Sequence, residues 1–386
     1  MPRIYLDYNA TTPVRPEVIE AMLPYFSEHF GNASSVHAFG QEAKGALEAA
    51  RVQVAALLNA SPGEIVFTSG GTEADNLGVI GGALAMATKG RHVVVSQIEH
   101  DAVLQAADHL EQAGFAVDRI PPDSRGVVAS RAIEAAIRSD TALVSVMAAN
   151  NETGVLQPTA EIGEICAKRG VAFHVDAVQV VSKAPIDAKA WQATLVTIAG
   201  HKFYAPKGVG ALYVKGGFKV APHQFGGSHE RGRRAGTENI PGIVGLGRAA
   251  ELARAELGTE PARIAALREK LEAGIMGGVP KVVRHGEGAP RVPNTSHLSF
   301  VGVEGEHLVL ALDTKGVAVS SGSACKSGSS NPSHVLLAMG VARDVAQSAV
   351  RFSLGRWTTE AEIDRVIEIL PGLVSKLRSA SPAAAS

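Results

Sequence analysis

The sequence predicts an α/β protein with a mostly parallel central sheet in a large domain and a second, smaller α+β domain. The chain has 386 residues, of which 46% are hydrophobic and 19% charged, with 41 glycines, a composition typical of α/β proteins. Short β-branched runs alternate with longer amphipathic runs between residues 65 and 215. After about residue 241 a long Ala/Leu/Glu/Arg-rich region replaces this alternation, which indicates a change of domain.

The elements of the large domain follow from this alternation. Runs such as IVFTSG, HVVVSQ and AFHVD favour strands, and the amphipathic stretches between them favour helices. Strands are expected at 65–70, 92–97, 115–120, 141–150, 172–176, 193–200 and 209–215. Helices are expected at 72–87, 101–114, 130–138 and 159–170. Because helices separate most of the strands, the strands should be largely parallel and covered on both faces.

The smaller domain is expected to combine helices and a few strands. The pattern predicts a helical region at 241–276, strands at 293–302 and 349–355, and a final helix at 358–378. We assign the large domain to residues 16–258 and the small domain to residues 1–15 together with 259–386. The small domain would carry a Ser/Gly-rich loop at about 320–332, which contains Cys325.

Charge and cysteine content exclude several classes of protein. The formal net charge of −1, without a basic tract, argues against binding to nucleic acid or to a membrane surface. The first residues do not resemble a signal peptide, so we expect a cytoplasmic protein. The two cysteines, Cys166 and Cys325, cannot build a disulfide framework or a Cys-rich zinc site, so no resident metal is expected. Cys166 fits an apolar helix face and is predicted to be inert core.

Polar residues gather at the predicted carboxyl ends of the parallel strands, where ligands of such sheets bind. These residues are Ser69–Thr72, His100, Asn150, Asn151, Asp176, His201 and Lys202. The segment SGGTEADN, residues 69–76, follows a strand and opens a helix, so its glycines and helix N-terminus could bind a phosphate. The alternative is a plain helix start with Thr72 as the N-cap.

Two further residues complete a recognisable set. Asp176 at a strand end requires a cationic partner, either a structural Arg or Lys or the protonated ring nitrogen of a cofactor. Lys202 is either a surface lysine or an amine that forms an imine. A phosphate site, a carboxylate and an amine in one sheet are what pyridoxal phosphate requires, so we predict this cofactor.

The chain closely resembles the cysteine desulfurases of the nitrogen-fixation and iron–sulfur-cluster group, which are pyridoxal-phosphate enzymes of fold type I. The resemblance covers nearly the whole chain through the motifs YLDYNATTPV, FGNASSVH, FTSGGTEADN, EHDAVL, ANNETG, HVDAVQ, GHKFYAPKGVGALY, ERGRRAGTEN, SSGSACKSG and RFSLGRWTTEAEID. It implies conversion of L-cysteine to L-alanine, with sulfur passing to a persulfide on Cys325 and then to an acceptor or iron–sulfur scaffold protein. It also implies a homodimer. The ERGRRAGTEN motif and the overall chain favour the nitrogen-fixation type, and a housekeeping desulfurase is the alternative.

The resemblance assigns a role to each motif residue. Lys202 would bond to the cofactor aldehyde, His100 would stack on the ring and move protons, and Asp176 would pair with the ring nitrogen. Contacts to the ring hydroxyl or phosphate are implied for Asn151, Gln179, Gly71, Thr72 and His201, and for Thr237 from the partner subunit. Arg351 and Asn151 would bind the substrate carboxylate.

Cys325 would be the nucleophile that takes the sulfur, and it is also a candidate transient ligand of an iron–sulfur cluster. A flexible loop would let this thiol enter the cofactor cleft and afterwards reach an acceptor. Lys326 or His100 would assist its ionisation. One residue departs from the family pattern, because many relatives have Ser where this chain has Ala199. One phosphate hydrogen bond would then be missing or supplied by Ser69 or water.

Three alternative functions remain open at this point. A selenocysteine lyase or an aminotransferase would use the same fold and cofactor. A non-catalytic sulfur-carrier or cluster-assembly scaffold would use Cys325 for docking or as a ligand and would need no cofactor. His37, His174 and His334 are predicted to be hydrogen-bonded packing residues or surface groups.

Overall fold

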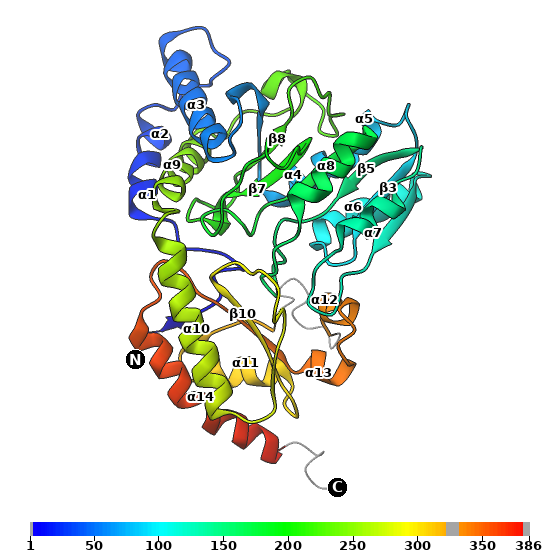
Figure 1. Cartoon of the computed structure of the whole chain (residues 1–386). Helices are drawn as coiled ribbons and strands as arrows, with labels where there is room; N and C mark the ends of the chain where they lie inside the picture. The colour runs from blue at the N-terminus through cyan, green and yellow to red at the C-terminus, as the bar shows by residue number, and fades with distance from the viewer. Residues whose placement is uncertain (1–2, 322–331, 381–386) are drawn as a thin grey trace.

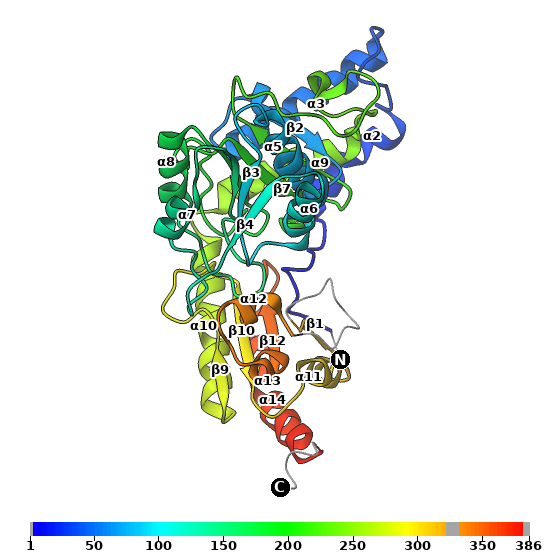
Figure 2. The same ribbon diagram turned by 90° about the vertical axis from the view of Figure 1, so that its right-hand side faces the viewer.

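The large domain is built on a central sheet with helices on both faces (Figures 1 and 2). The protein is described by a computed structural model that covers residues 3–321 and 332–380. Within these residues the sheet has seven strands in the order β2-β8-β7-β6-β5-β3-β4. They are β2 (Ile65–Thr68), β3 (His92–Ser96), β4 (Ala116–Ile120), β5 (Thr141–Ser145), β6 (Ala172–Asp176), β7 (Leu195–Ala199) and β8 (Gly210–Val214).

The sheet is mostly parallel, as predicted. β8 runs antiparallel to both of its neighbours, β2 and β7, whereas the pairs from β7 through to β4 are parallel. Every residue of β3, β5, β6, β7 and β8 is buried, which explains their nearly continuous apolar runs. The edge strand β4 is partly exposed, and it carries the charged residues Asp118 and Arg119 in its sequence AVDRI.

The helices that connect the strands lie close to their predicted positions. They are α4 (Gly71–Asn76), a π-helical turn (Leu77–Gly81), α5 (Gly82–Ala85), α6 (Asp101–Gln112), α7 (Ser130–Ala136) and α8 (Thr159–Arg169). The π turn divides the helix predicted at 72–87. It lies against the sheet, because a Cβ on Gly78 would come within 2.6 Å of the His174 ring.

The N-terminal segment contributes helices that the sequence pattern did not assign. These are α1 (Pro16–Met22), α2 (Pro24–Ser27) and α3 (Ala38–Leu57). α3 packs along α9 (Ile240–Glu256), where a Cβ on Gly247 would come within 2.7 Å of the Ala50 backbone. The helical region predicted at 241–276 is two helices, since α9 ends before α10 (Glu260–Gly278) begins. Pro261 stands in the first turn of α10, where it can start a helix but not continue one.

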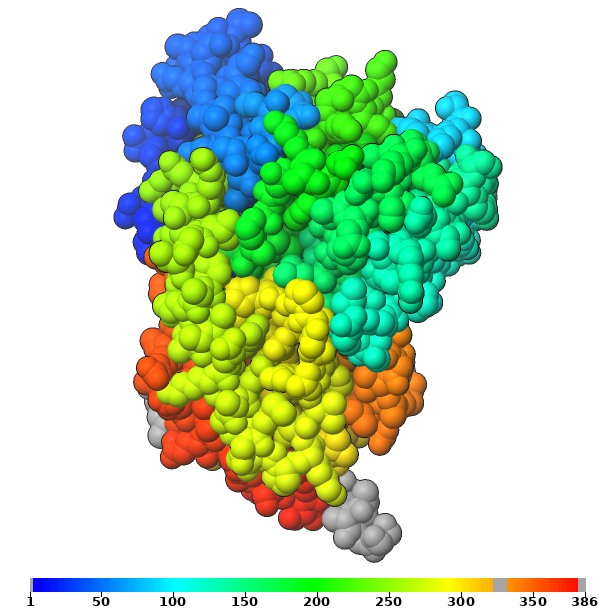
Figure 3. All heavy atoms as spheres, in the orientation of Figure 1, coloured from blue at the N-terminus to red at the C-terminus, as the bar shows by residue number. Residues whose placement is uncertain are grey.

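The small domain has its own sheet and its own hydrophobic core (Figure 1). Its antiparallel sheet has the order β12-β10-β9, formed by β9 (Val282–Arg284), β10 (Thr295–Phe300) and β12 (Ala349–Ser353). The remaining helices are α11 (Gly305–Asp313), α12 (His334–Ala338), α13 (Arg343–Gln347) and α14 (Glu360–Ala380). In the space-filling view this part of the chain, coloured yellow to red, forms the lower half of the molecule (Figure 3).

The N-terminus belongs to the small domain in space. The short strand β1 (Ile4–Tyr5) pairs in parallel with β11 (Val317–Ala318), and Asp7 forms a bridge with Ser353. Residues of β1, α10 and α14 share one hydrophobic cluster that is separate from the clusters of the large sheet. The first cluster of the large sheet also takes in Val335, Leu336 and Ala349 of the C-terminal part, so the boundary between the two domains stays a prediction.

Candidate active site

A cavity of about 320 Å³ lies between the large sheet and the small domain. Its walls come from the carboxyl ends of β6 and β7, the starts of α4 and α6, and β12 of the small domain. The structure brings together most of the residues predicted for the site: Gly71, Thr72, His100, Asn151, Asp176, Gln179, His201, Lys202 and Arg351.

Among the described residues, one predicted site residue does not line this cavity. Thr237 is exposed and does not line it, although the sequence expectation placed this residue in a partner subunit's site. Cys325 lies outside the described residues, together with Lys326. Two residues near the strand ends have other positions: Ser69 is exposed, and Asn150 is buried and holds the following turn by accepting from Glu152 N at 3.0 Å.

Lys202 is the last residue of a short 3-10 turn (Gly200–Lys202) that directly follows β7. Its Nζ donates to the backbone oxygens of Asn9 at 2.7 Å and Ala10 at 2.9 Å, so the N-terminal segment crosses the end of the sheet at this point. The neighbouring His201 contacts Thr11 Oγ1 through Nδ1 at 3.2 Å. Burial, followed by the charge of Lys202, lowers the pKa of His201 to about 4, which keeps this ring neutral.

The start of α4 is shaped for close approach of a ligand. Gly70 has a φ of +157° and stands at the N-cap without a side-chain cap, so the alternative with Thr72 as N-cap is wrong. A Cβ on Gly71 would come within 3.2 Å of the Ala199 side chain. The first turn therefore presents backbone N–H groups beside Thr72, the arrangement that binds a phosphate. Ala199 lines the cavity and Ser69 does not. Ser69 therefore does not replace the serine hydroxyl that many relatives have at position 199.

His100 is held by the start of α6. It is the N-cap residue of this helix, and its Nδ1 accepts a hydrogen bond from Ala102 N at 3.1 Å. Because Nδ1 accepts, the neutral ring carries its proton on Nε2. The ring is thus oriented by a local main-chain contact and lines the cavity with a defined tautomer.

A pair of buried carboxyl groups lies at the base of the cavity. Burial raises the pKa of Asp176, and electrostatic interactions with His100 and Lys202 oppose this rise. Burial and the charge of Asp176 raise the pKa of Asp75 well above its usual range. We assign the proton of the pair to Asp75, because its neighbour at 3.6 Å is His174, whose pKa is lowered to about 3 by burial.

The small domain contributes a buried arginine. Arg351 is 2% exposed, its Nη1 donates to Asn151 O at 3.0 Å, and its Nη2 forms an ion pair with Asp7 at 2.8 Å. Asn151 belongs to the turn after β5 in the large domain, so this contact joins the two domains at the cavity. A planar guanidinium at this position can bind a carboxylate through two parallel hydrogen bonds.

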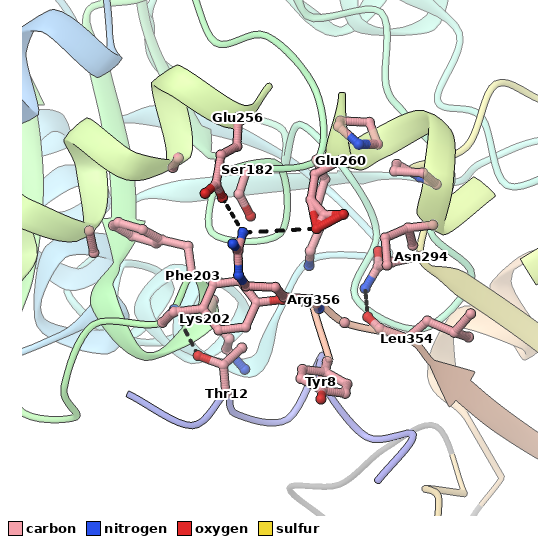
Figure 4. A pocket seen from close by; sticks show the side chains of 18 of the residues that line it. Tyr8, Thr12, Ser182, Lys202, Phe203, Glu256, Glu260, Asn294, Leu354 and Arg356 are labelled. Atoms are coloured by element: carbon pink, nitrogen blue, oxygen red, sulfur yellow. Dashed lines mark hydrogen bonds and ion pairs between the residues drawn. The ribbon is translucent and has the colours of Figure 1, made fainter. Parts of the chain in front are cut away.

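A second, smaller cavity of about 40 Å³ lies beside the first, and Lys202 lines both (Figure 4). Arg356 projects into it and pairs with Glu256 and Glu260. The space is large enough for a few water molecules but not for a substrate.

Several residues of the main cavity were missed at the sequence level: Asn9, Ala10, Asp75, Asp101, Met147, Glu152, Val178 and His334. His334 was interpreted as a packing or surface group, yet it lines the cavity and contacts Glu99 O at 3.1 Å. The other two histidines fit the same interpretation: His37 is an exposed group that caps α3, and His174 is buried and contacts Ser145 Oγ at 2.8 Å. Cys166 is buried core, and burial raises its pKa to about 12.

Glu99, next to His100, gives a pH-dependent prediction. Its carboxyl is buried, accepts from Met147 N at 2.8 Å and contacts Ser96 Oγ, and burial raises its pKa from 4.5 to about 8. A raised folded pKa means that stability is present at low pH and is lost as the pH rises from about 4.5 to about 8. In cofactor-free protein, Glu99→Gln should therefore raise the free energy of unfolding at pH 8 by about 2 kcal/mol and change it little at pH 4.5.

Urea unfolding of both proteins at the two pH values measures this difference. Equal pH dependence in the wild type and the Gln variant would contradict the assignment of a protonated Glu99.

The residues of the main cavity fit pyridoxal phosphate. The buried carboxylate of Asp176 lies at the base, an amine lies at Lys202, and uncapped N–H groups lie at the start of α4. His100 and Lys202 lower the pKa of Asp176 and so favour its charged form, and a protonated pyridine nitrogen would neutralise that charge. Fold and cavity together define a fold-type I pyridoxal-phosphate enzyme.

Comparison with known proteins identifies the family. Residues 4–366 match the model of the class-V aminotransferase family, and the chain belongs to this family. It is 52% identical over 382 residues to a protein named cysteine desulfurase IscS from Anaeromyxobacter dehalogenans, covering 98% of this chain and 94% of that protein. It is 49% identical over 379 residues to a cysteine desulfurase from Nostoc sp., with the same coverage. A solved NifS-like protein superposes with a TM-score of 0.91 at 39% identity, over 97% of this chain and 100% of the other.

Proposed function

We propose that this protein is a pyridoxal-phosphate-dependent cysteine desulfurase that converts L-cysteine to L-alanine and supplies sulfur for iron–sulfur cluster assembly. The observation that carries this function is the cavity in which Lys202, Asp176 and Arg351 meet. Relatives of about half-identical sequence over nearly the whole chain are cysteine desulfurases.

The cofactor would be held by residues of both the strand ends and the helix start. Asp176 would bind its ring nitrogen, Lys202 its aldehyde carbon, and the first turn of α4 with His201 its phosphate. Gln179 and Asn151, which both line the cavity, would contact the ring hydroxyl. When bound, pyridoxal phosphate supplies an electron sink for the bonds around the substrate α-carbon.

The protein's own side chains orient the substrate and move its protons. Arg351, fixed by Asp7 and Asn151, binds the carboxylate of cysteine through its guanidinium. His100, whose tautomer is set by Ala102 N, exchanges a proton at Nε2. The amine of Lys202 is positioned by the Asn9 and Ala10 carbonyl groups and accepts the proton that leaves the α-carbon.

Sulfur transfer requires a nucleophile, and we assign it to Cys325. The Cys325 thiolate attacks the substrate sulfur, the carbon–sulfur bond breaks, and the sulfur stays on the enzyme as a persulfide. The carbon skeleton gains a proton and leaves as alanine. Cys166 is unsuited to this step because it is buried and its pKa is raised to about 12, so it is not a thiolate at neutral pH.

The function is tested with purified protein supplied with L-cysteine as the sole substrate and dithiothreitol as reductant. A yellow protein that releases alanine and sulfide in equal amounts is expected. An aminotransferase would make no alanine without a keto acid, and a scaffold protein would be colourless. A selenocysteine lyase would release alanine from selenocysteine much faster than from cysteine.

A homodimer is part of this proposal. Large apolar side chains are exposed together in residues 23–39 of the α1–α3 region, namely Leu23, Phe26, Phe30, Val36 and Phe39. Val36 is 92% exposed and Phe30 66%, and such a patch is typical of a surface that a second copy of the chain covers. The partner would also supply Thr237, which is exposed and does not line the cavity of its own chain.

The double variant Phe30→Glu/Val36→Glu should shift the protein from dimer to monomer in sedimentation velocity, because it buries charges in an apolar interface. The exposed-site variant Leu310→Glu is the control and should stay dimeric, since Leu310 lies on α11 of the small domain. A monomeric wild type would contradict the proposal.

The cellular setting extends beyond the geometry of the site. We infer a cytoplasmic protein that donates sulfur to an acceptor or scaffold protein, with a role in nitrogen fixation as its particular use. Across residues 3–321 and 332–380, no helix combines the length and apolar character needed to cross a bilayer.

A further inference from the structure

A buried lysine that the reaction above does not use lies beside the cofactor cavity. Lys183 is 9% exposed, and its Nζ donates to Gln179 Oε1 at 2.7 Å and to Asn9 Oδ1 at 3.3 Å. Within the part of the chain that the structure describes, no carboxylate forms an ion pair with it. Burial, followed by the charges of Lys202 and Arg351, lowers its pKa well below the usual range. A lysine buried without an anion is costly, so a specific task must offset that cost.

The contacts of Lys183 determine how the Gln179 amide is oriented. The backbone oxygen of Asn9 can only accept, and it takes a hydrogen bond from Gln179 Nε2 at 3.0 Å. On the other side, Lys183 Nζ donates to Gln179 Oε1. The amide therefore lies between an acceptor and a donor, and a rotation by 180° would lose both hydrogen bonds. One N–H of Gln179 Nε2 remains for a ligand in the cavity that this residue lines.

The same network reaches the catalytic lysine. The Asn9 oxygen that accepts from Gln179 also accepts from Lys202 Nζ at 2.7 Å. The Asn9 side chain accepts from Asn294 Nδ2 at 2.9 Å as well as from Lys183, so a small-domain residue shares this anchor. Lys183 lines the smaller cavity, which Figure 4 shows, and its hydrogen-bond partner Gln179 lines the main cavity.

We propose that Lys183 is a positioning residue, which holds the Gln179 amide so that its nitrogen, not its oxygen, faces the ring hydroxyl of the cofactor. This inference rests on the proposed role of Gln179. A donor at this oxygen stabilises its negative charge and so weakens the hold of the oxygen on the proton that it shares with the Lys202–cofactor bond. Loss of the donor should raise the pH at which the bound chromophore loses that proton.

The test is a spectrophotometric pH titration of the holoenzyme without substrate. Lys183→Met keeps the volume of the side chain and removes the donor, a change that buried sites usually tolerate. We expect its titration midpoint to lie about one pH unit above that of the wild type. Lys183→Gln retains an N–H donor and should stay closer to the wild type. Lys189→Met, the same change at an exposed lysine six residues along the chain, should leave the midpoint unchanged.

Combination with Gln179→Met tests whether Lys183 acts through Gln179. Gln179→Met alone should raise the midpoint by a similar amount, and Lys183→Met should add nothing further in that background. Additive shifts, an unchanged midpoint in Lys183→Met, or an equal shift in Lys183→Gln would each overturn the inference. A wild-type protein without a visible band would instead refute the proposed function.

The Gln179→Met background distinguishes a direct effect of the Lys183 charge on the titration midpoint from an effect through the orientation of Gln179. Removal of a positive charge would also raise the midpoint, but it would do so equally in the Gln179→Met background. The variants leave unchanged the other titratable and charged groups that line the main cavity, which are Asp75, His100, Asp101, Glu152, Asp176, His201, Lys202, His334 and Arg351.

Discussion

Replacement of Lys202 with alanine is expected to abolish the covalent attachment of the cofactor and to lower alanine production by more than about a thousandfold. The physical reason is that Lys202 is the amine in the main cavity that bonds to the aldehyde and then moves the α-proton, and its position is set by two main-chain carbonyl groups. Asp176 and the start of α4 remain, so the variant should still bind the cofactor noncovalently.

Mass spectrometry after borohydride reduction measures the attachment, and an alanine assay measures the turnover. Lys207→Ala, an exposed lysine five residues along the chain, is the matched control and should keep both properties. A Lys202→Ala protein that still carried the reduced cofactor on another amine would show that the assignment of this lysine is wrong.

The second large effect is expected for Cys325→Ser, which should lower sulfide and alanine production by at least about a hundredfold while the protein stays yellow. A hydroxyl at this position cannot accept sulfur, whereas the cofactor residues of the cavity are unchanged. Spectra with and without L-cysteine should show that the substrate still binds, because Arg351 and its contacts are intact.

Cys166→Ala is the matched control for this experiment. It removes the other cysteine from the α8 face, where it is fully buried, and should lower the free energy of unfolding by about 1 kcal/mol without loss of turnover. Full activity in Cys325→Ser would mean that sulfur leaves the substrate without this thiol, as in a lyase.

Much of the site followed from local sequence because the fold places strand ends together. Asp176 is the last residue of the buried strand β6, and Lys202 ends the short turn after β7. The carboxyl ends of these adjacent parallel strands meet at one edge of the sheet. His100 could be found in the same way, since it follows β3 and caps the next helix. The position of Arg351 was implied by family resemblance, since its strand belongs to another sheet.

Other residues carry no local signal of this kind. Asn9 lies in a segment without regular structure, far from the sheet in sequence, yet its oxygen accepts from both Lys202 and Gln179. Lys183 lies in a turn and belongs to no motif, and its burial and its hydrogen bond to Asn9 arise only from tertiary packing. The break between α9 and α10 was also missed, because the helix propensity of the whole region outweighed the signal from Pro261.

The sequence alone determines the order of the strands and connecting helices in the large domain, the cover of helices on its sheet and the chemistry at the strand ends. Hydrophobic periodicity and strand-end position depend on residues that are neighbours along the chain. Only the tertiary structure decides the polar network around Asn9, the proton assigned to Asp75 and the neutral state of His201. They depend on burial and on charges brought together from distant segments, and desolvation acts only once those segments have packed.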